Sequence, residues 1–110
     1  LTPLTQGFHE IAHSLRWKPS PRSDDGGTLM ALSVINEMFD LGEVNAGLLY
    51  LASGQSYPEH QHPPQELYLT ITGDADWRYG GSKDYVRRAP GSVLYNHPGD
   101  LHGIKANNEP

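Results

Sequence analysis

The chain has 110 residues, enough for one domain with its own core and too few for two. Its net charge is −5 and its eight Lys and Arg are scattered, which disfavours nucleic-acid binding, and no apolar run approaches the roughly 20 residues of a membrane-spanning helix. The absence of cysteine excludes disulfides and thiolate metal ligands, and it fits a reducing compartment, so we expect a cytoplasmic protein.

Both ends of the sequence have the character of trimmed ends. The chain starts at Leu1 without a Met or a secretory signal, and it stops at Pro110 shortly after a predicted strand. We therefore expect a single domain that is incomplete at its ends. Residues 1–43 are expected to form a helical N-terminal extension and residues 44–110 a β-barrel.

Apolar residues with helical spacing mark the N-terminus. Leu4, Phe8, Ile11 and Leu15 lie at i, i+4, i+7 and i+11, on one face of a helix, and Thr5 is a candidate cap. Residues 18–27, rich in Pro, Ser, Asp and Gly, predict a loop after this helix.

The segment 28–41 is ambiguous between helix and strand. The spacing of Leu29, Leu32, Ile35 and Phe39 favours a helix, although residues 33–36 are also compatible with a strand edge. We interpret the segment as a helix. From Val44 onward, short β-prone runs separated by Gly, Pro, Asn and Asp are typical of a β-barrel or sandwich.

A hairpin is expected within this β region. Residues 66–72 alternate polar and apolar side chains, and Gly73-Asp74 reads as a two-residue turn leading into residues 75–79. In that register Thr70 would face Trp77, and Tyr68 would face Tyr79.

The same alternation predicts two unlike faces, because side chains of one parity share a face of a strand. One face is polar and aromatic and the other is aliphatic; the first holds Glu66, Tyr68, Thr70, Trp77 and Tyr79, the second Leu67, Leu69 and Ile71. This asymmetry suits a barrel with a binding pocket inside and an outer face covered by the N-terminal helix or by a second subunit, as in a homodimer.

Histidines and a glutamate form a candidate metal site. His60 and His62 are two residues apart, so both lie on one side of a strand, and the prolines at 63 and 64 end that strand before Glu66 begins the next. A third imidazole, His102, follows another turn. Three imidazoles and a carboxylate suit one divalent transition metal ion, which could be Zn, Fe(II), Mn, Ni or Co.

The spacings around these ligands resemble the two motifs of the cupin family. They read Gly54-x5-His60-x-His62-x3-Glu66-x6-Gly73 and Gly91-x7-Gly99-x2-His102. The second motif departs from the family at His97, where cupins usually carry Pro, and at Ala106, where Asn is common; we expect His97 at the surface. The resemblance implies a mainly β fold, the double-stranded β-helix or jelly-roll-like small barrel of cupins.

The flanking residues are similar to those of one cupin family. The run from Tyr57 to Tyr68 looks like the Tyr-Pro-x-His-x-His-Pro-x-x-Glu-x-Tyr signature of the DddQ-like lyases, which act on dimethylsulfoniopropionate (DMSP). The resemblance implies a metal-dependent lyase that splits this small zwitterion by β-elimination into dimethyl sulfide and acrylate. The metal would bind the substrate carboxylate and stabilise the enolate-like charge, and Tyr57 or Tyr68 would take the proton.

The sulfonium cation of DMSP favours aromatic faces. Trp77 and Tyr79, predicted to point inward beside Tyr68, are the candidates for binding it.

Two alternatives stay open. His9-Glu10-Ile-Ala-His13 matches the His-Glu-x-x-His pattern of zinc peptidases, with the Asn36-Glu37 pair as the source of a third ligand. His9 and Glu10 lie off the apolar helix face, however, and too few residues precede them for a substrate-binding sheet. The other alternative is a different cupin activity: a dioxygenase, a small-molecule isomerase, or a non-catalytic metal-dependent sensor.

Overall fold

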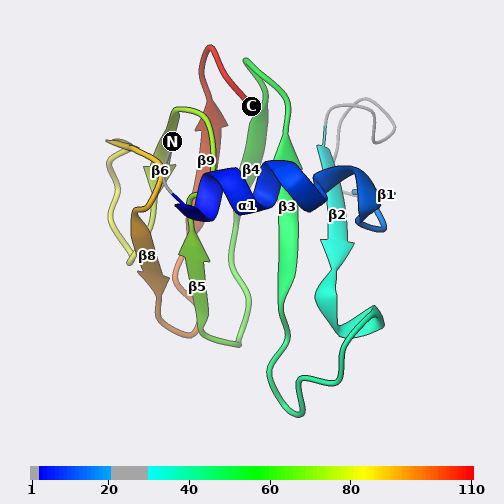
Figure 1. Cartoon of the computed structure of the whole chain (residues 1–110). Coiled ribbons are helices and arrows are strands. Elements are labelled where there is room, and N and C mark those ends of the chain that lie inside the picture. Colours follow the sequence, from blue (N-terminus) through cyan, green and yellow to red (C-terminus); the bar gives the residue numbers. More distant parts are fainter. Residues whose placement is uncertain (1–2, 21–29) are drawn as a thin grey trace.

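A computed structural model of the chain describes residues 3–20 and 30–110 (Figure 1). Their helices and strands follow in the order α1 (Pro3–Ile11), η1 (Ala12–Ser14), β1 (Lys18–Pro19), β2 (Met30–Val34), η2 (Ile35–Glu37), β3 (Gly47–Leu51), β4 (Ser56–His60), β5 (Glu66–Leu69), β6 (Ala75–Arg78), β7 (Val86–Arg88), β8 (Val93–Asn96) and β9 (His102–Ala106). The prediction of a mainly β fold with a helix at its N-terminus is confirmed.

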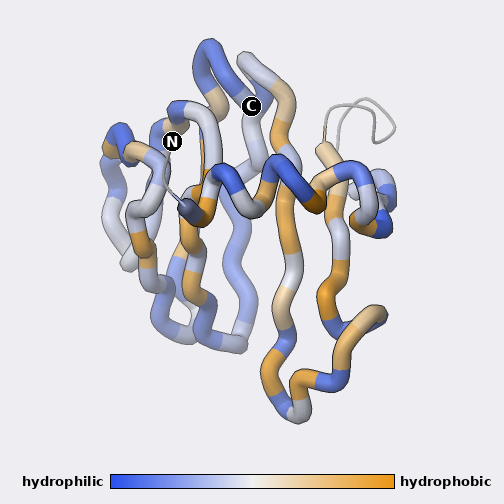
Figure 2. Tube along the Cα trace, viewed as in Figure 1, coloured by the Kyte–Doolittle hydropathy of each residue, from blue (hydrophilic) through white to orange (hydrophobic). Residues whose placement is uncertain are grey.

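The strands form three antiparallel sheets, with the orders β1-β2-β3, β4-β9-β6-β7 and β5-β8. All three contribute to one apolar core, made of Met30, Leu51, Trp77, Leu94, Ile104 and Ala106. Figure 2 shows that β2 and β3 carry mostly hydrophobic residues. Because every sheet buries a side chain in the same cluster, the sheets enclose a common interior.

The N-terminal helix is shorter and less buried than its apolar spacing predicts. α1 ends at Ile11, so Leu15 lies beyond it, and Leu4 and Ile11 are exposed. The contact with the barrel is made instead by the buried Thr5, whose hydroxyl donates a hydrogen bond of 2.5 Å to the carbonyl of Ile71; Thr5 is therefore not a cap. None of the helices in residues 3–20 and 30–110 is both long and apolar enough to cross a membrane.

The interpretation of residues 28–41 as a helix is wrong. Residues 30–34 form β2, and only residues 35–37 make a helical turn; positions 28 and 29 lie outside the described residues. β2 pairs with β3 over its whole length, from Met30↔Leu51 to Val34↔Gly47, and with β1 on its other side. A short apolar run fits either periodicity, and here the pairing partner decides. The predicted loop 18–27 is also corrected at Lys18–Pro19, which form β1; residues 21–27 lie outside the described residues.

The predicted hairpin is wrong in its pairing. β5 pairs with β8, whereas β6 lies between β9 and β7 in another sheet. The segment between β5 and β6 crosses from one sheet to the other: the backbone N–H of Thr70 donates to Ser92, and the carbonyl of Asp74 accepts from Asn107. Thr70 and Trp77 are therefore not cross-strand neighbours, nor are Tyr68 and Tyr79.

The two unlike faces of β5 are nevertheless present. Glu66 and Tyr68 are half-buried on the inner side, while Leu67 is 63% exposed and Leu69 45% exposed on the outer side. The alternation predicted these faces because the period of two is local to a strand. The N-terminal helix does not cover Leu67 and Leu69, so the expectation that it would do so is wrong for these two residues.

Candidate metal centre

Three imidazoles from different parts of the chain converge at one end of the β4-β9 ladder. His60 closes β4 and His102 opens β9, and the two are partners in the ladder. His62 follows β4 in the connection to β5. One ring nitrogen from each of the three lies within 4.8 Å of the others, and within the described residues this is the sole such group of His, Asp or Glu. The three histidines can therefore bind one metal ion.

Each of these imidazoles is held by its Nδ1 atom. His60 Nδ1 lies 2.8 Å from the carbonyl of Pro58, His62 Nδ1 2.9 Å from that of Pro64, and His102 Nδ1 2.9 Å from that of Asp100. A carbonyl oxygen only accepts hydrogen bonds, so the proton of each neutral ring is on Nδ1 and the lone pair is on Nε2. This arrangement orients a histidine for binding a metal through Nε2.

The Glu66 carboxylate joins two of the three rings. Its Oε2 contacts His62 Nε2 and lies 3.4 Å from His102 Nε2. The His102 side chain is buried, and its Nε2 has no hydrogen-bond partner within the described part of the chain. Nε2 lone pairs and a carboxylate repel one another unless a cation or a proton lies between them. The donor set therefore fits a divalent metal ion.

Backbone geometry explains how these residues meet. β4 ends at His60, two residues earlier than predicted, and its ladder is irregular between Tyr57 and His60. The N–H of Gly99 donates to the carbonyl of His62 at 2.9 Å, which ties the turn before His102 to the turn after β4. Gly99 has φ +79°, a conformation that residues with a Cβ rarely adopt. Irregular ladders of this kind re-aim side chains at functional sites.

The two tyrosines predicted as candidate bases lie against different histidines. The Tyr57 ring stacks on His60, with centroids 4.3 Å apart and planes at 15°. The Tyr68 ring lies 6.0 Å from His102 and 5.1 Å from Trp77. The structure thus brings both tyrosines to the three imidazoles.

Trp77 and Tyr79 differ in their surroundings. Trp77 belongs to the core, and its Nε1 has no hydrogen-bond partner among the residues that the structure describes. The guanidinium of Arg88 lies 5.4 Å from the centre of the Tyr79 ring and donates a hydrogen bond to the Tyr79 hydroxyl. A cation of the protein itself therefore already lies over the Tyr79 ring.

Glu59, next to His60 in sequence, points away from the imidazoles. It forms an ion pair of 2.9 Å with Arg78 and accepts a hydrogen bond of 2.9 Å from the Tyr85 hydroxyl. The hydrogen bond from Arg78 holds the pKa of the Glu59 carboxyl below its usual value. Burial raises the pKa of Tyr85. Glu59 is thus already engaged by Arg78 and Tyr85.

The zinc-peptidase motif does not assemble a site. α1 ends at Ile11, so His9 and His13 belong to different helical segments, and both are exposed together with Glu10. Glu37, the suggested further ligand, is paired with Lys18 at 2.8 Å. Within residues 3–20 and 30–110, these side chains do not join any group with metal-ligand spacing.

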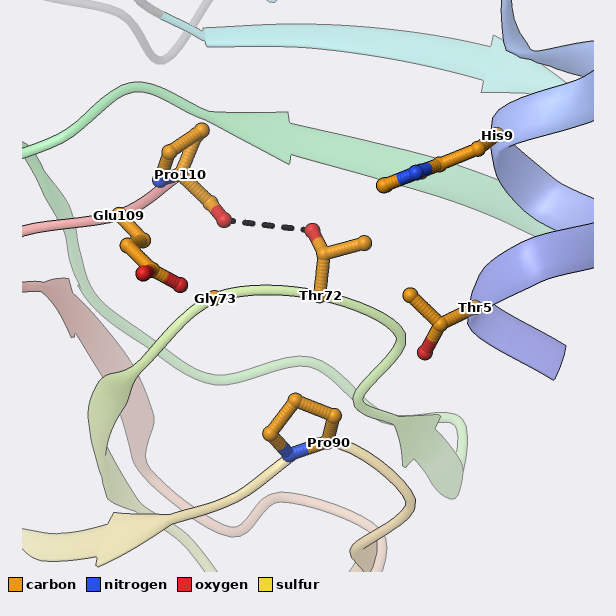
Figure 3. Close-up of a pocket in the computed structure, with 7 residues that line it drawn as sticks. All are labelled: Thr5, His9, Thr72, Gly73, Pro90, Glu109 and Pro110. Atoms are coloured by element: carbon orange, nitrogen blue, oxygen red, sulfur yellow. Dashed lines mark hydrogen bonds between the residues drawn. The ribbon is translucent and has the colours of Figure 1, made fainter. Parts of the chain in front are cut away.

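His9 faces a pocket of about 610 Å³ between α1 and the C-terminal residues (Figure 3). The residues that line it are Thr5, His9, Thr72, Gly73, Pro90, Glu109 and Pro110. Neither the three imidazoles of the candidate metal centre nor the two tyrosines beside them belong to this lining. The pocket is therefore separate from the candidate metal centre.

The prediction that His97 lies at the surface is confirmed, because 70% of its side chain is exposed beside Asp100.

Asn96 is a residue near this centre that the sequence patterns do not identify. It is buried at the end of β8 and pairs with Glu66 across the β5-β8 ladder. The only signal in the sequence is its place inside the second motif, between Gly91 and Gly99, which indicates proximity to His102 in the chain but not burial.

Three comparisons relate the chain to known proteins. Residues 37–110 match the model of the dimethylsulfoniopropionate lyase family. A stretch of 65 residues is 31% identical to dimethylsulfoniopropionate lyase DddQ from Ruegeria pomeroyi, covering 59% of this chain and 32% of that protein. The crystal structure of DMSP lyase DddQ from Ruegeria pomeroyi superposes with a TM-score of 0.72 at 22% identity, over 94% of this chain and 56% of the other.

The crystal structure confirms the cupin-type fold predicted from the motifs. The chain spans about a third of the curated relative and about half of the crystallised chain. The family match includes all three histidines and Glu66. The chain belongs to the dimethylsulfoniopropionate lyase family.

Proposed function

We propose that this protein is a metal-dependent carbon–sulfur lyase that cleaves DMSP to dimethyl sulfide and acrylate. The observation that supports it best is the set of three imidazoles, each held through Nδ1, with two tyrosines beside them in a member of this family. In this proposal the metal ligands are His60, His62, Glu66 and His102.

The reaction is a β-elimination. A base removes a proton from the carbon next to the substrate carboxylate, the C–S bond breaks, and dimethyl sulfide leaves with the electron pair of that bond while the double bond of acrylate forms. A divalent metal ion at the site would supply electrostatic stabilisation for the negative charge that develops at the carboxylate. Zn, Fe(II), Mn, Ni and Co all suit this donor set.

Tyr57 or Tyr68 is the proposed base. A free tyrosine has a pKa of about 10, and a cation nearby favours the phenolate. Tyr57 stacks on one proposed ligand and Tyr68 lies at the edge of another, so each would be close to a bound cation. We assign the role to these two without ranking them.

Trp77 and Tyr79 are the proposed substrate-binding aromatics. The Tyr68 ring lies 5.1 Å from the Trp77 ring, so Trp77 would be next to a substrate bound at the tyrosines. Because Arg88 already lies over the Tyr79 ring, we propose that Trp77 contacts the sulfonium of the substrate. Tyr79 then acts indirectly, by positioning Arg88.

The deciding experiment measures dimethyl sulfide in the headspace over metal-loaded protein and DMSP. Wild type should release it, His62→Ala should release none above background, and at least one of Tyr57→Phe and Tyr68→Phe should lose about 100-fold or more in kcat, since general acid–base catalysis contributes about 10²–10⁴-fold. Wild-type protein that binds metal but releases no dimethyl sulfide would contradict the proposal.

We also propose that the protein is a cytoplasmic homodimer whose subunits meet on the outer face of β5 and β8. Four large apolar side chains are exposed there, in cross-strand pairs: Leu67 with Tyr95 and Leu69 with Val93. A patch of this kind typically contacts another protein surface.

A further inference from the structure

Asn96 is a buried polar residue next to the candidate metal centre that the proposed chemistry does not use. Its side chain is 1% exposed, and it lies at the end of β8 directly opposite Glu66, the first residue of β5. Directly opposed residues of an antiparallel pair share a face, with Cβ atoms about 4.5–5.5 Å apart. The Asn96 amide therefore lies on the same inner side as the Glu66 carboxylate.

The orientation of this amide is fixed by the backbone. Asn96 Oδ1 accepts a hydrogen bond of 2.9 Å from the N–H of Gly80, just after β6. Reversing the amide would set its NH₂ group against this N–H donor, so the oxygen must face Gly80. The two N–H bonds of Asn96 Nδ2 consequently point away from the Gly80 N–H.

Asn96 Nδ2 has no hydrogen-bond partner within the described residues. Leaving a buried donor unpaired costs free energy, so a residue of this kind is expected to meet an acceptor that the protein itself does not supply. The strand opposite carries Glu66, and the Glu66 carboxylate contacts His62 and lies 3.4 Å from His102. A ligand of a metal at this site would lie beside Glu66, within reach of the amide.

We infer that Asn96 is a substrate-binding residue, whose Nδ2 donates a hydrogen bond to a carboxylate oxygen of the molecule bound at the metal centre. The inference rests on the proposed function for the identity of that molecule, but it requires only a carboxylate ligand. A neutral amide donor suits this place, because it pairs with a carboxylate without adding a cation that would repel the metal.

Asn96→Asp is the sharpest variant. It has the shape of Asn and keeps the oxygen that accepts from Gly80, while it replaces the donor by a second oxygen. Asn96→Ala is the second variant, because it removes the donor without adding charge. Asn108→Asp is the matched control: it makes the same change at an exposed position near the C-terminus.

The measurement is calorimetric binding of acrylate to the zinc-loaded proteins, with metal content and melting temperature recorded for each. Losing a hydrogen bond to a charged group weakens binding by about 10- to 100-fold. We expect this loss of acrylate affinity in both Asn96 variants, with one zinc retained per chain, and an unchanged affinity in Asn108→Asp.

The outcomes separate this inference from the lyase proposal. Equal acrylate affinity in wild type and both metal-loaded Asn96 variants overturns the role of Asn96 and leaves the lyase proposal standing. No acrylate binding to zinc-loaded wild type also overturns it. If wild type releases no dimethyl sulfide yet binds acrylate in an Asn96-dependent manner, the lyase proposal fails and the carboxylate site remains.

Discussion

The three imidazoles share one local arrangement, a bond from Nδ1 to a carbonyl two residues away in the chain. Two of these carbonyls precede their histidine, at Pro58 and Asp100, and one follows it, at Pro64. Because each contact joins near neighbours in sequence, the orientation of the rings depends on the turns around them. The meeting of the rings depends on the ladder between β4 and β9.

His102→Ala should remove the most buried of the proposed metal ligands. We expect the metal content after dialysis to fall well below one ion per chain. Metal affinity should fall by at least about 10- to 100-fold, because even the loss of a residue that only supports a ligand has an effect of that size. His97→Ala is the matched control, since His97 lies in the turn that precedes His102 but is exposed. Equal metal content in the two variants would rule out His102 as a ligand.

Trp77→Leu tests the proposed contact between the Trp77 ring and the sulfonium of DMSP. A desolvated cation–π contact is worth about 1–2 kcal/mol, so KM for DMSP should rise by roughly 5- to 30-fold with little change in kcat. Trp77→Phe keeps a ring and should lose less. An unchanged KM in the folded Leu variant, with folding checked by its melting temperature, would exclude Trp77 from the substrate site.

At the scale of elements, β9 is the strand on which the site depends most. It pairs with β4 on one side and with β6 on the other. His60 on β4, His102 on β9 and Trp77 on β6 therefore belong to a single sheet. Close packing along β9 is visible at Gly103, where an added Cβ would lie 3.0 Å from the Tyr85 hydroxyl and 3.1 Å from Glu59 Cγ. There is therefore little space for a larger side chain at position 103 of β9.

Gly103→Ala should destabilise the protein by about 1–3 kcal/mol, the usual cost of overpacking a buried position. Gly7→Ala is the contrasting change, because nothing lies within 4 Å of the Cβ it adds in α1, and it should stabilise the protein by about 0.5–1 kcal/mol. Urea unfolding of both variants gives the two free energies. A Gly103→Ala variant as stable as wild type would show that Tyr85 and Glu59 move aside freely.

At the scale of the whole molecule, the outer face of β5 and β8 leaves Leu67 63% exposed and Val93 60% exposed. If a second subunit covers this face, wild-type protein should have the mass of a dimer in light scattering, and the double variant Leu67→Ser, Val93→Ser should shift to the monomer mass. Lys83→Ser, at an exposed position outside β5 and β8, is the control. A monomeric wild type at micromolar concentration would contradict the homodimer.

The sequence by itself determined the inner and outer faces of β5, the mainly β class and the histidines that meet. These depend on local rules: the period of two in a strand, the turn-forming residues, and spacings that place His60, His62 and His102 next to turns. The family resemblance was also readable, because its motif is contiguous from Tyr57 to Tyr68. The division of the chain at residue 43 stays a prediction.

Only the tertiary structure decided which strands pair and which polar side chains are buried. The dipeptide Gly73-Asp74 is typical of a hairpin turn, but here it lies in a segment that links two different sheets. Residues 30–34 form a strand because they pair with β3. No pattern in the sequence indicates that Asn96 lies opposite Glu66. Pairing and burial are set by contacts between residues far apart in the chain, and the pattern within a short segment does not contain them.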